Sequence, residues 1–457
     1  MDETIFREYD IRGVYPTQID EKTAYTIGRS YGSYIQEKLK RDICGVGRDN
    51  RLSSPSLAKE LIRGITDSGC NVMDFGLVTT PMYFFGCLKS NVIIGIMVTA
   101  SHNPKDDNGF KFSVDHLGNA RGEQIKDFKR YTLTGIFKSG KGKVTELKID
   151  DYYKSFIKEK IDMGKRRLKV VLDCGNGTTS LFAKDIYSQF PNLDITMICD
   201  TSDATFPNHH PDPAVPENNK MLQDKVREIN ADIGIGFDGD GDRVGFVDEY
   251  GAIVPTDKAM IIFIRSINDK VTKKEYLYDV KCSKALEDEI IRLGGTPICF
   301  RTGASWTRYK TNKDNLPFGG EFSGHMFFTD KWPGFDSGIY NGLRMLEVLS
   351  NTKKSFSELL NGISKYYSTP EIKIKVTDES KFEIVKGVLE YAQRQKYDIL
   401  DIDGVRVTFP DGWALVRASN TGPNLTVRFE AKTEERLQEI HEEFDKVIER
   451  EKARFNL

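Results

Sequence analysis

One arrangement occurs three times along this chain: an apolar run typical of a buried strand, then a polar loop, then a helix-forming segment. The three loops lie at 99–104, 238–243 and 320–325. Strands that alternate with helices are typical of a mainly parallel sheet covered by helices. Such sheets bind ligands beside the carboxyl ends of their strands, so we expect the three loops to share one kind of location.

The arrangement divides the chain into units that restart near residues 150 and 252. Helices are predicted at 21–39, 54–69, 180–190, 259–267, 285–295 and 337–350, and strands at 42–49, 71–78, 92–100, 167–173, 193–200, 231–237 and 275–283. The chain of 457 residues is also too long for a single hydrophobic core. We therefore predict three tandem mixed α/β domains at 1–147, 148–251 and 252–368.

The last ~90 residues have a different pattern. Strands are predicted at 371–376, 404–419 (broken by a turn) and 425–431, and an amphipathic helix at 432–455. The apolar positions of that helix fall three or four apart and predict a core-facing stripe: Leu437, Ile440, Phe444 and Val447. We predict a smaller α+β domain at 369–457, joined by a linker near 367–371.

The charge balance limits the partners of this protein. The net charge is −2, from 66 basic and 68 acidic residues. A nucleic-acid-binding protein carries a large basic excess, and a membrane span needs an apolar run of ~20 residues. Neither feature is present, so we expect no nucleic-acid and no membrane partner. An anionic ligand would have to be bound by local clusters of polar groups.

The cysteines and the first residues indicate the compartment. Seven cysteines are spread along the chain, an odd number without any CxxC pair. This pattern argues against a disulfide framework or a structural zinc site and fits a reducing compartment. The first ten residues lack the basic region and the apolar region of a signal peptide. We expect a cytoplasmic protein.

Three carboxylates at alternate positions, Asp238, Asp240 and Asp242, follow the apolar run at 231–237. Glycine spacers let the backbone curl so that the carboxylates converge, and their mutual repulsion is relieved by a cation. Hard oxygen ligands of this kind suit Mg²⁺ or Ca²⁺. An EF-hand needs glycine where Arg243 stands and helices where strands are predicted. A solvated acidic turn is the remaining alternative.

Ser101, followed by His102, ends another apolar run. A hydrolase nucleophile is one interpretation, but the chain lacks the GxSxG turn, and neighbouring residues of an extended loop point apart. A phosphoserine is a better one, because its phosphate would supply oxygens for the cation beside the aspartates. A turn with a capping serine is the third alternative.

Two more loops carry convergent polar groups. Glu321 and Ser323 are two residues apart, so in an extended segment they share a face while Phe322 points away, and together they suit vicinal sugar hydroxyls. Loop capping explains this pair equally well. The residues that follow Arg417 make an anion cradle of hydroxyl, amide and glycine groups.

Taken together, these four loops resemble the α-D-phosphohexomutase family, in its phosphomannomutase/phosphoglucomutase branch. The loops that carry the resemblance, in the family's order, are 99–104 (TASHNP), 238–243 (DGDGDR), 320–325 (GEFSGH) and 417–431 (RASNTGPNLTVRFEA). The segments FREYDIRGVY at 6–15 and NGFK at 108–111 also resemble family segments. The resemblance covers essentially the whole chain. It implies four domains around a central cleft and reversible transfer of a phosphoryl group between C1 and C6 of a mannose or glucose phosphate.

The family resemblance also implies roles for individual residues. Phospho-Ser101 would pass its phosphoryl group to the sugar and take another back from a hexose 1,6-bisphosphate, which is also the primer. Mg²⁺ would be held by Ser101 as its phosphate, Asp238, Asp240 and Asp242. The catalytic group would be Ser101, His102, Lys111, Arg243, His325 and Arg12. Substrate would be bound by Tyr9, Lys281, Glu321, Ser323, His325, Arg417, Ser419, Asn420 and Thr421.

One position departs from the family, because Ala304 stands where a histidine commonly follows Thr-Gly. A role assigned to that histidine would pass to His325 or Lys281. The alternative functions are a phosphoglucosamine mutase, a phosphosugar phosphatase and a non-catalytic phosphosugar-binding protein. We expect small hexose phosphates as the partners, and a monomer or weak homodimer.

Overall fold

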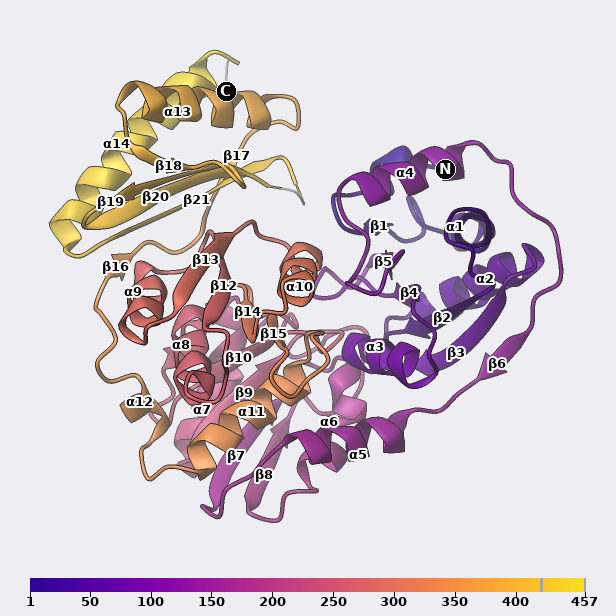
Figure 1. The fold of residues 1–457 in the computed structure, drawn as a ribbon, viewed down its shortest axis with the longest axis horizontal. Coiled ribbons are helices and arrows are strands. Elements are labelled where there is room, and N and C mark those ends of the chain that lie inside the picture. Colours follow the sequence, from indigo (N-terminus) through magenta and orange to yellow (C-terminus); the bar gives the residue numbers. More distant parts are fainter. Residues whose placement is uncertain (420–421, 456–457) are drawn as a thin grey trace.

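The computed structural model describes residues 1–419 and 422–455. Four separate sheets follow one another along the chain, each accompanied by helices (Figure 1). The predicted fold class is confirmed: three α/β units precede a smaller C-terminal α+β unit. Among the described residues, no helix combines the length and the apolar character that a membrane span requires.

The first sheet is mixed and has the order β1-β5-β4-β2-β3-β6. Its strands are β1 (Ile11–Val14), β2 (Ile43–Arg48), β3 (Asn71–Leu77), β4 (Gly95–Val98), β5 (Asp107–Phe112) and β6 (Val144–Glu146). Its helices are η1 (Glu3–Ile5), α1 (Glu21–Lys38), α2 (Ser54–Asp67), α3 (Thr80–Lys89) and α4 (Glu123–Leu133). Strands β2, β3, β4 and β6 pair in parallel, whereas β5 runs antiparallel to β1 and β4.

Helices α1 and α2 lie unusually close because each has a glycine at the contact. A Cβ atom on Gly28 would come within 2.2 Å of Leu61 O, and one on Gly64 within 2.2 Å of Tyr25 O. Only glycine allows backbones to approach this closely. The tight pair covers one face of the first sheet and holds the ends of β2 and β4 in place.

The second sheet has the order β11-β10-β9-β7-β8. Its strands are β7 (Leu168–Asp173), β8 (Leu193–Ile198), β9 (Ile233–Phe237), β10 (Val244–Val247) and β11 (Ile253–Val254). Its helices are α5 (Asp150–Lys160), η2 (Thr178–Leu181), α6 (Ala183–Tyr187), η3 (Pro216–Asn219) and α7 (Lys220–Ile229). The helix predicted at 180–190 is short, because η2 and α6 occupy that stretch. Strands β9 and β10 form the hairpin whose turn carries the three aspartates.

The third sheet has the order β13-β12-β14-β15. Its strands are β12 (Glu275–Asp279), β13 (Thr296–Phe300), β14 (Phe318–Gly320) and β15 (Met326–Phe328). Its helices are α8 (Thr256–Ile267), α9 (Lys284–Arg292), α10 (Ala304–Lys313), α11 (Gly338–Ser350) and α12 (Phe356–Leu359). The helix predicted at 337–350 is confirmed as α11.

The second and third units share one hydrophobic core, which fixes the positions of their loops relative to one another. Its buried residues come from α3, α5, β7, β9, α8 and α11. Gly342 of α11 lies against the second unit, since a Cβ there would meet the Tyr187 hydroxyl at 2.2 Å. The first unit joins this core through α3.

The fourth sheet has the order β16-β21-β20-β19-β18, and β17 also pairs with β21. Its strands are β16 (Tyr367–Ser368), β17 (Ile372–Lys375), β18 (Asp398–Leu400), β19 (Val405–Phe409), β20 (Gly412–Ala418) and β21 (Asn424–Ala431), and its helices are α13 (Ser380–Arg394) and α14 (Glu434–Ala453). The stripe predicted on α14 is confirmed, because Ile440, Phe444 and Val447 are buried and Leu437 packs against them.

Two expectations about local structure are confirmed only in part. The strand predicted at 92–100 is confined to Gly95–Val98, and the residues on either side form connections. The linker predicted near 367–371 includes β16, which pairs with β21 and so belongs to the last sheet. Apolar character alone does not separate a strand from the buried connection beside it.

Candidate active site

A cavity of about 900 Å³ lies where the four units meet. Its lining includes residues of all four units and most of the predicted site: Tyr9, Arg12, Ser101, His102, Lys111, Asp242, Arg243, Lys281, Glu321, Ser323, His325, Arg417 and Ser419. Asp238 and Asp240 lie behind the lining, with no exposed surface. Asn420 and Thr421 lie outside the described residues. The structure therefore brings four sequence-distant loops to one cavity.

Ser101 follows β4 in a strained backbone conformation. Its φ is +53°, in the left-handed region that non-glycine residues rarely adopt. The Ser101 amide donates to Thr99 Oγ1 at 2.9 Å, and the Ser101 hydroxyl lies 3.2 Å from Asp238 Oδ2. Strain of this kind is concentrated at functional sites, where surrounding contacts hold it in place. The hydroxyl of the first unit thus faces the aspartate turn of the second.

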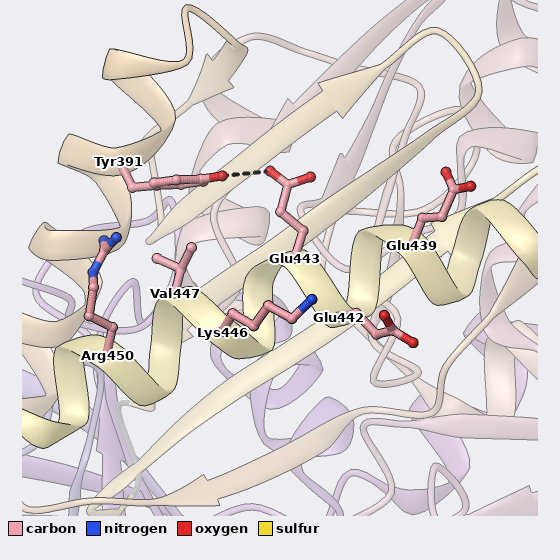
Figure 2. Close-up of a pocket in the computed structure, with 7 residues that line it drawn as sticks. All are labelled: Tyr391, Glu439, Glu442, Glu443, Lys446, Val447 and Arg450. Atoms are coloured by element: carbon pink, nitrogen blue, oxygen red, sulfur yellow. Dashed lines mark hydrogen bonds between the residues drawn. The ribbon is translucent and has the colours of Figure 1, made fainter.

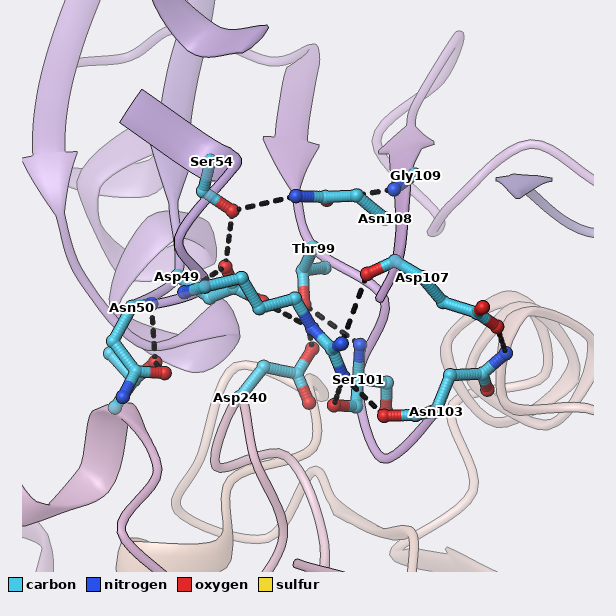
Figure 3. A network of polar contacts seen from close by, with 12 residues as sticks. Asp49, Asn50, Ser54, Thr99, Ser101, Asn103, Asp107, Asn108, Gly109 and Asp240 are labelled. Carbon is cyan, nitrogen blue, oxygen red and sulfur yellow. Dashed lines mark hydrogen bonds and ion pairs between the residues drawn. The ribbon is translucent and has the colours of Figure 1, made fainter. Parts of the chain in front are cut away.

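One guanidinium holds the whole Ser101 loop. Figure 3 shows the network around Ser101, Asn103 and Asp107. Arg51 donates to the carbonyls of Ser101 at 2.8 Å, Asn103 at 2.7 Å, Pro104 at 2.6 Å and Asp107 at 3.0 Å. Its Nε lies 3.3 Å from Asp49 Oδ2, and both side chains are 1% exposed. A buried arginine that satisfies four carbonyls fixes the path of the loop.

His102 lies beside Ser101, contrary to the expectation that the two side chains point apart. The turned backbone places His102 Nδ1 3.3 Å from the Ser101 hydroxyl. Burial and the nearby cations, Arg243 first among them, hold the pKa of His102 well below its usual value, so the imidazole is neutral. Within the described residues no carboxylate contacts His102. The third member of a Ser-His-Asp triad is therefore missing.

The three aspartates form one buried cluster, with carboxylate oxygens within 4.8 Å of one another. Burial and the neighbouring carboxylates raise the pKa values of Asp238 and Asp242. Burial also opposes charge on Asp240, but Lys111 outweighs it and holds the pKa of Asp240 low. Opposite pKa shifts within one group of carboxylates are typical of like charges that need a cation.

Two oxygens of the cluster show that it fits a divalent cation. Asp240 Oδ1 and Asp242 Oδ1 are buried, and neither has a hydrogen-bond partner among the described residues. Buried polar atoms are normally paired, so orphaned carboxylate oxygens that converge indicate a ligand. All the donors are hard oxygens, which suits Mg²⁺. The EF-hand is excluded by the β9–β10 hairpin that carries the cluster.

Lys111 and Arg243 surround the aspartates with positive charge. Lys111 Nζ lies 2.8 Å from Asp240 Oδ2 and 2.7 Å from Asp242 Oδ2. Burial opposes the lysine charge, but the two carboxylates outweigh it and raise the pKa of Lys111. Arg243 donates from Nε to His325 Nε2 at 2.8 Å. Lys111 is thus a fixed cation and not a base in this arrangement.

His325 positions Arg243, and its tautomer follows from its partners. Because arginine only donates, His325 Nε2 accepts the hydrogen bond from Arg243. His325 Nδ1 then carries the proton and donates to Asp336 Oδ2 at 2.7 Å. The chain Arg243–His325–Asp336 connects the aspartate turn with the loop at 320–325. Arg12 is held separately by Asn103 Oδ1 at 2.7 Å and Asp10 at 2.6 Å.

Glu321 and Ser323 do lie together, but for a different reason from the one expected. Residues 321–325 form the turn between β14 and β15, not an extended segment. The Ser323 hydroxyl lies 3.2 Å from Glu321 Oε2. Phe322 does not point away, because it lines the cavity and stacks under the Arg428 guanidinium at 3.9 Å.

Two donors from the start of α10 hold the other oxygen of Glu321. Thr307 Oγ1 donates to Glu321 Oε1 at 2.6 Å, and the Gly303 amide donates to the same oxygen at 2.8 Å. Burial raises the pKa of Glu321, and the hydrogen bond from Thr307 opposes that rise. The hydrogen bond from Thr307 therefore favours the ionised form of Glu321 and fixes the orientation of its carboxylate.

We expect Thr307→Val to weaken substrate binding at low pH. Valine keeps the shape of threonine but removes the donor, so the pKa of Glu321 rises further. The acid limb of kcat/KM then moves to higher pH, and KM rises while kcat changes little. A pH profile identical to that of the unmodified protein would contradict this role. Thr307→Ser is the matched control, because it keeps the hydroxyl.

The fourth unit contributes one cation, Arg417, and the third unit another, Lys281, and both already have carboxylate partners in the fourth unit. Arg417 Nε lies 3.1 Å from Asp403 Oδ2, and Lys281 Nζ lies 3.0 Å from Glu371 Oε2. Asp403 also accepts the Thr302 amide at 3.0 Å and so connects the third and fourth units. Arg417 and Lys281 are thus held on the same side of the cavity, away from the aspartate cluster.

Several residues that the sequence did not single out hold the site together: Asp49, Arg51, Thr80, Thr307, Asp336, Glu371 and Asp403. Thr80, for example, donates to Asp240 Oδ2 at 2.6 Å from the start of α3. All but Asp49 contact a predicted residue from another part of the chain, and Asp49 acts through Arg51. The spacing of these residues along the sequence does not predict such contacts.

A second, shallower depression lies on the C-terminal unit, between α13 and α14 (Figure 2). Its lining is mostly charged, and Tyr391 donates to Glu443 Oε1 at 3.1 Å. The charged groups there belong to the outer face of α14, and none of the predicted site residues lies in it. The chemistry is therefore confined to the central cavity.

Comparison with known proteins shows similarity along almost the whole chain. Models of the phosphoglucomutase/phosphomannomutase family, each described as an alpha/beta/alpha domain, match residues 3–137, 150–251 and 255–367 as domains I, II and III. The model of the C-terminal domain of the same family matches residues 371–447. The order of the four models is the order of the four sheets.

Individual relatives agree with the family models. A phosphomannomutase/phosphoglucomutase of Pseudomonas syringae pv. tomato is 43% identical over 451 residues, 97% of this chain and 96% of the relative. A phosphoglucomutase of Neisseria meningitidis serogroup A is 39% identical over 97% of this chain and 96% of its own length. The crystal structure of a phosphoglucomutase/phosphomannomutase family protein from Burkholderia thailandensis superposes with a TM-score of 0.92 at 35% identity, covering 99% of this chain and 98% of that one. This chain belongs to the phosphoglucomutase/phosphomannomutase family.

Proposed function

We propose that this protein is a phosphomannomutase/phosphoglucomutase, an enzyme that transfers a phosphoryl group reversibly between C1 and C6 of a hexose phosphate. One observation carries the proposal: the Ser101 hydroxyl lies 3.2 Å from Asp238 in a cavity that also presents Arg12, Lys111 and Arg243. A hydroxyl between a cation site and several fixed positive charges suits phosphoryl transfer, in which the protein positions groups and stabilises negative charge.

In this mechanism phospho-Ser101 gives its phosphoryl group to the free hydroxyl of the sugar phosphate. The bond from phosphorus to the Ser101 oxygen breaks as the bond to the sugar oxygen forms. The proton of the sugar hydroxyl passes to the neutral imidazole of His102, whose Nδ1 lies 3.3 Å from the Ser101 oxygen and delivers a proton to that oxygen as it departs. Lys111 and Arg243 neutralise the transferring group. The resulting hexose 1,6-bisphosphate turns over, and its other phosphoryl group returns to Ser101.

Asp238, Asp240 and Asp242 would hold Mg²⁺ together with an oxygen of the phosphorylated Ser101. The orphaned oxygens of Asp240 and Asp242 support this assignment. When bound, the ion polarises the phosphoryl oxygens and offsets their charge. Removal of the ion with a chelator would then abolish turnover.

We assign the orientation of the substrate to lining residues of the cavity that lie outside the aspartate cluster. Glu321 and Ser323 would bind the sugar hydroxyls O3 and O4, which lie in the middle of the ring and remain in reach in both orientations. Arg417 and Ser419 would bind the phosphate that is not being transferred, with Asn420 and Thr421 from the same loop. Glucose and mannose differ at C2, so this arrangement accepts both. Tyr9 and Lys281 complete this lining.

The proposal is tested by formation of glucose 6-phosphate from glucose 1-phosphate, with Mg²⁺ and a trace of glucose 1,6-bisphosphate to phosphorylate Ser101. Turnover is expected, and also with mannose 1-phosphate. Release of inorganic phosphate in place of the isomeric sugar phosphate would indicate a phosphatase. Turnover of glucosamine 1-phosphate alone would favour the phosphoglucosamine mutase, and no turnover of any of them would favour a binding protein.

We expect Asp240→Asn to weaken the response to Mg²⁺. The amide keeps the shape but removes one of three ligand charges, so the Mg²⁺ concentration for half-maximal activity rises at least about tenfold. A Mg²⁺ titration of activity measures this, and calorimetry measures binding directly. Asp224→Asn, an exposed carboxylate on α7, is the control. Equal titrations of the two variants would refute the assignment of the cluster.

We also propose the finer organisation expected from the sequence: domains at 1–147, 148–251, 252–368 and 369–457, in a monomer or weak homodimer, with β16 at the last boundary extending into the fourth sheet. A cytoplasmic location is supported by seven free cysteines.

A further inference from the structure

Arg308 is a charged residue of the cavity that has no charged partner. It lies on α10, one turn after Ala304, and both residues line the cavity. Residues four apart share a face of a helix, and helical side chains lean toward the N-terminus. The guanidinium of Arg308 is therefore directed toward the turn where the short Ala304 side chain leaves room.

The surroundings of Arg308 are aromatic. Its guanidinium carbon lies 3.8 Å from the centre of the Phe84 ring and 6.0 Å from that of Phe335. Its Nε and Nη1 are buried and have no hydrogen-bond partner among the described residues. Among the described residues, no carboxylate oxygen lies within 4.0 Å of the Arg308 guanidinium, the distance that defines an ion pair. A guanidinium stacked on a ring keeps its donors in its own plane, and Nη2 of Arg308, which is not among the buried unpaired atoms, remains available to an anion in the cavity.

Three buried arginines of this protein differ from Arg308, which is only partly buried. Arg51 satisfies four carbonyls, Arg344 pairs with Asp330 at 2.8 Å, and Arg417 pairs with Asp403. Buried charges are normally paired in this way, because an unpaired charge is costly. Burial lowers the pKa of Arg308, and the more distant Asp336 only partly offsets this. A guanidinium that lines the cavity without a charged partner is thus suited to bind an anionic ligand.

We propose that Arg308 is a phosphate-binding residue, which takes a phosphoryl oxygen of the sugar bisphosphate on the wall between the first and third units. The inference rests on the proposed mutase function. Phe84 comes from α3 of the first unit and Arg308 from α10 of the third, so this contact lies across the junction of the two units. Its position differs from that of Arg417, which belongs to the fourth unit. Arg308 therefore binds the intermediate while it turns between its two orientations, and so limits its escape.

The test measures binding of glucose 1,6-bisphosphate by calorimetry, in protein that carries Ser101→Ala so that no phosphoryl group is exchanged. Arg308→Met keeps the stem and the stacking but removes the charge. We expect it to lower the affinity at least about tenfold, the effect of one charge-assisted contact. Arg308→Lys keeps a charge without the planar fork and is expected to recover part of the loss.

Arg121→Met is the matched control. Arg121 also stacks on an aromatic ring at this junction, 3.8 Å from the centre of Tyr309, but it pairs with Asp115 at 3.4 Å and does not line the cavity. We expect its affinity for the bisphosphate to be unchanged. In protein with Ser101 intact, Arg308→Met is also expected to need more added glucose 1,6-bisphosphate for sustained turnover.

The outcomes distinguish the proposed role of Arg308 from the mutase function on which it rests. If the parent protein binds the bisphosphate and Arg308→Met binds it equally tightly, the role of Arg308 is overturned while the mutase function stands. If the parent binds neither glucose nor mannose 1,6-bisphosphate, the mutase function itself is overturned. An equal loss in Arg308→Met and Arg121→Met would indicate a structural effect of the junction and would also overturn the inference.

Discussion

Ser101→Ala is expected to abolish sustained turnover, with a fall in kcat of at least about 10³-fold, as for the loss of a nucleophile in covalent catalysis. The reason is geometric. Ser101 is the hydroxyl that the loop after β4 presents to the aspartate cluster, at 3.2 Å from Asp238 Oδ2. Without it the protein has no group at that place to hold the phosphoryl group between the two transfers. The glucose 1-phosphate assay measures the loss.

A second measurement distinguishes this loss from misfolding. Intact-mass spectrometry after incubation with glucose 1,6-bisphosphate is expected to show one added phosphoryl group on the unmodified protein and none on Ser101→Ala. Ser90→Ala is the control, because that hydroxyl bonds only to the backbone at the end of α3 in the same unit. Normal rates in Ser101→Ala, or a phosphoryl group still added to it, would remove Ser101 from the mechanism.

Much of this arrangement could be predicted from the sequence, because the strand–loop–helix pattern is local. The apolar runs located β4 and β9, and their polar ends located Ser101 and the aspartates. The stripe on α14 followed from helical periodicity alone. The rule that loops gather at the carboxyl ends of parallel strands then placed separate motifs in one cavity.

The remaining features depend on contacts between distant residues. Residues 321–325 form a tight turn because β14 and β15 pair, which the apolar pattern does not reveal. His102 lies beside Ser101 because Ser101 adopts a positive φ, a choice imposed by its surroundings. Thr307 reads as an ordinary helix residue until Glu321 is placed against it. Residues such as Thr307, which contact a site residue from another element, are found only when the fold is known.

Arg51 is the strongest example, and Arg51→Met has the second large expected effect. The change leaves four carbonyls, that of Ser101 buried, without their donor and the buried Asp49 without its cation. Removing one partner of a buried ion pair costs about 3–5 kcal/mol. For a domain of 150–250 residues this corresponds to a fall in Tm of roughly 6–20 °C. Differential scanning calorimetry is expected to show that fall in the transition that includes the first unit.

Activity gives the second readout for Arg51. Because Arg51 holds the carbonyl of Ser101 itself, the protein that remains folded is expected to have a lower kcat, whereas KM changes little, since Arg51 does not line the cavity. Arg130→Met is the control, because Arg130 is exposed on α4 and pairs only with neighbouring carboxylates. An unchanged Tm and kcat in Arg51→Met would mean that the loop keeps its path without the guanidinium. The left-handed conformation of Ser101 would then have to be held by the Thr99 hydroxyl and the aspartate turn alone.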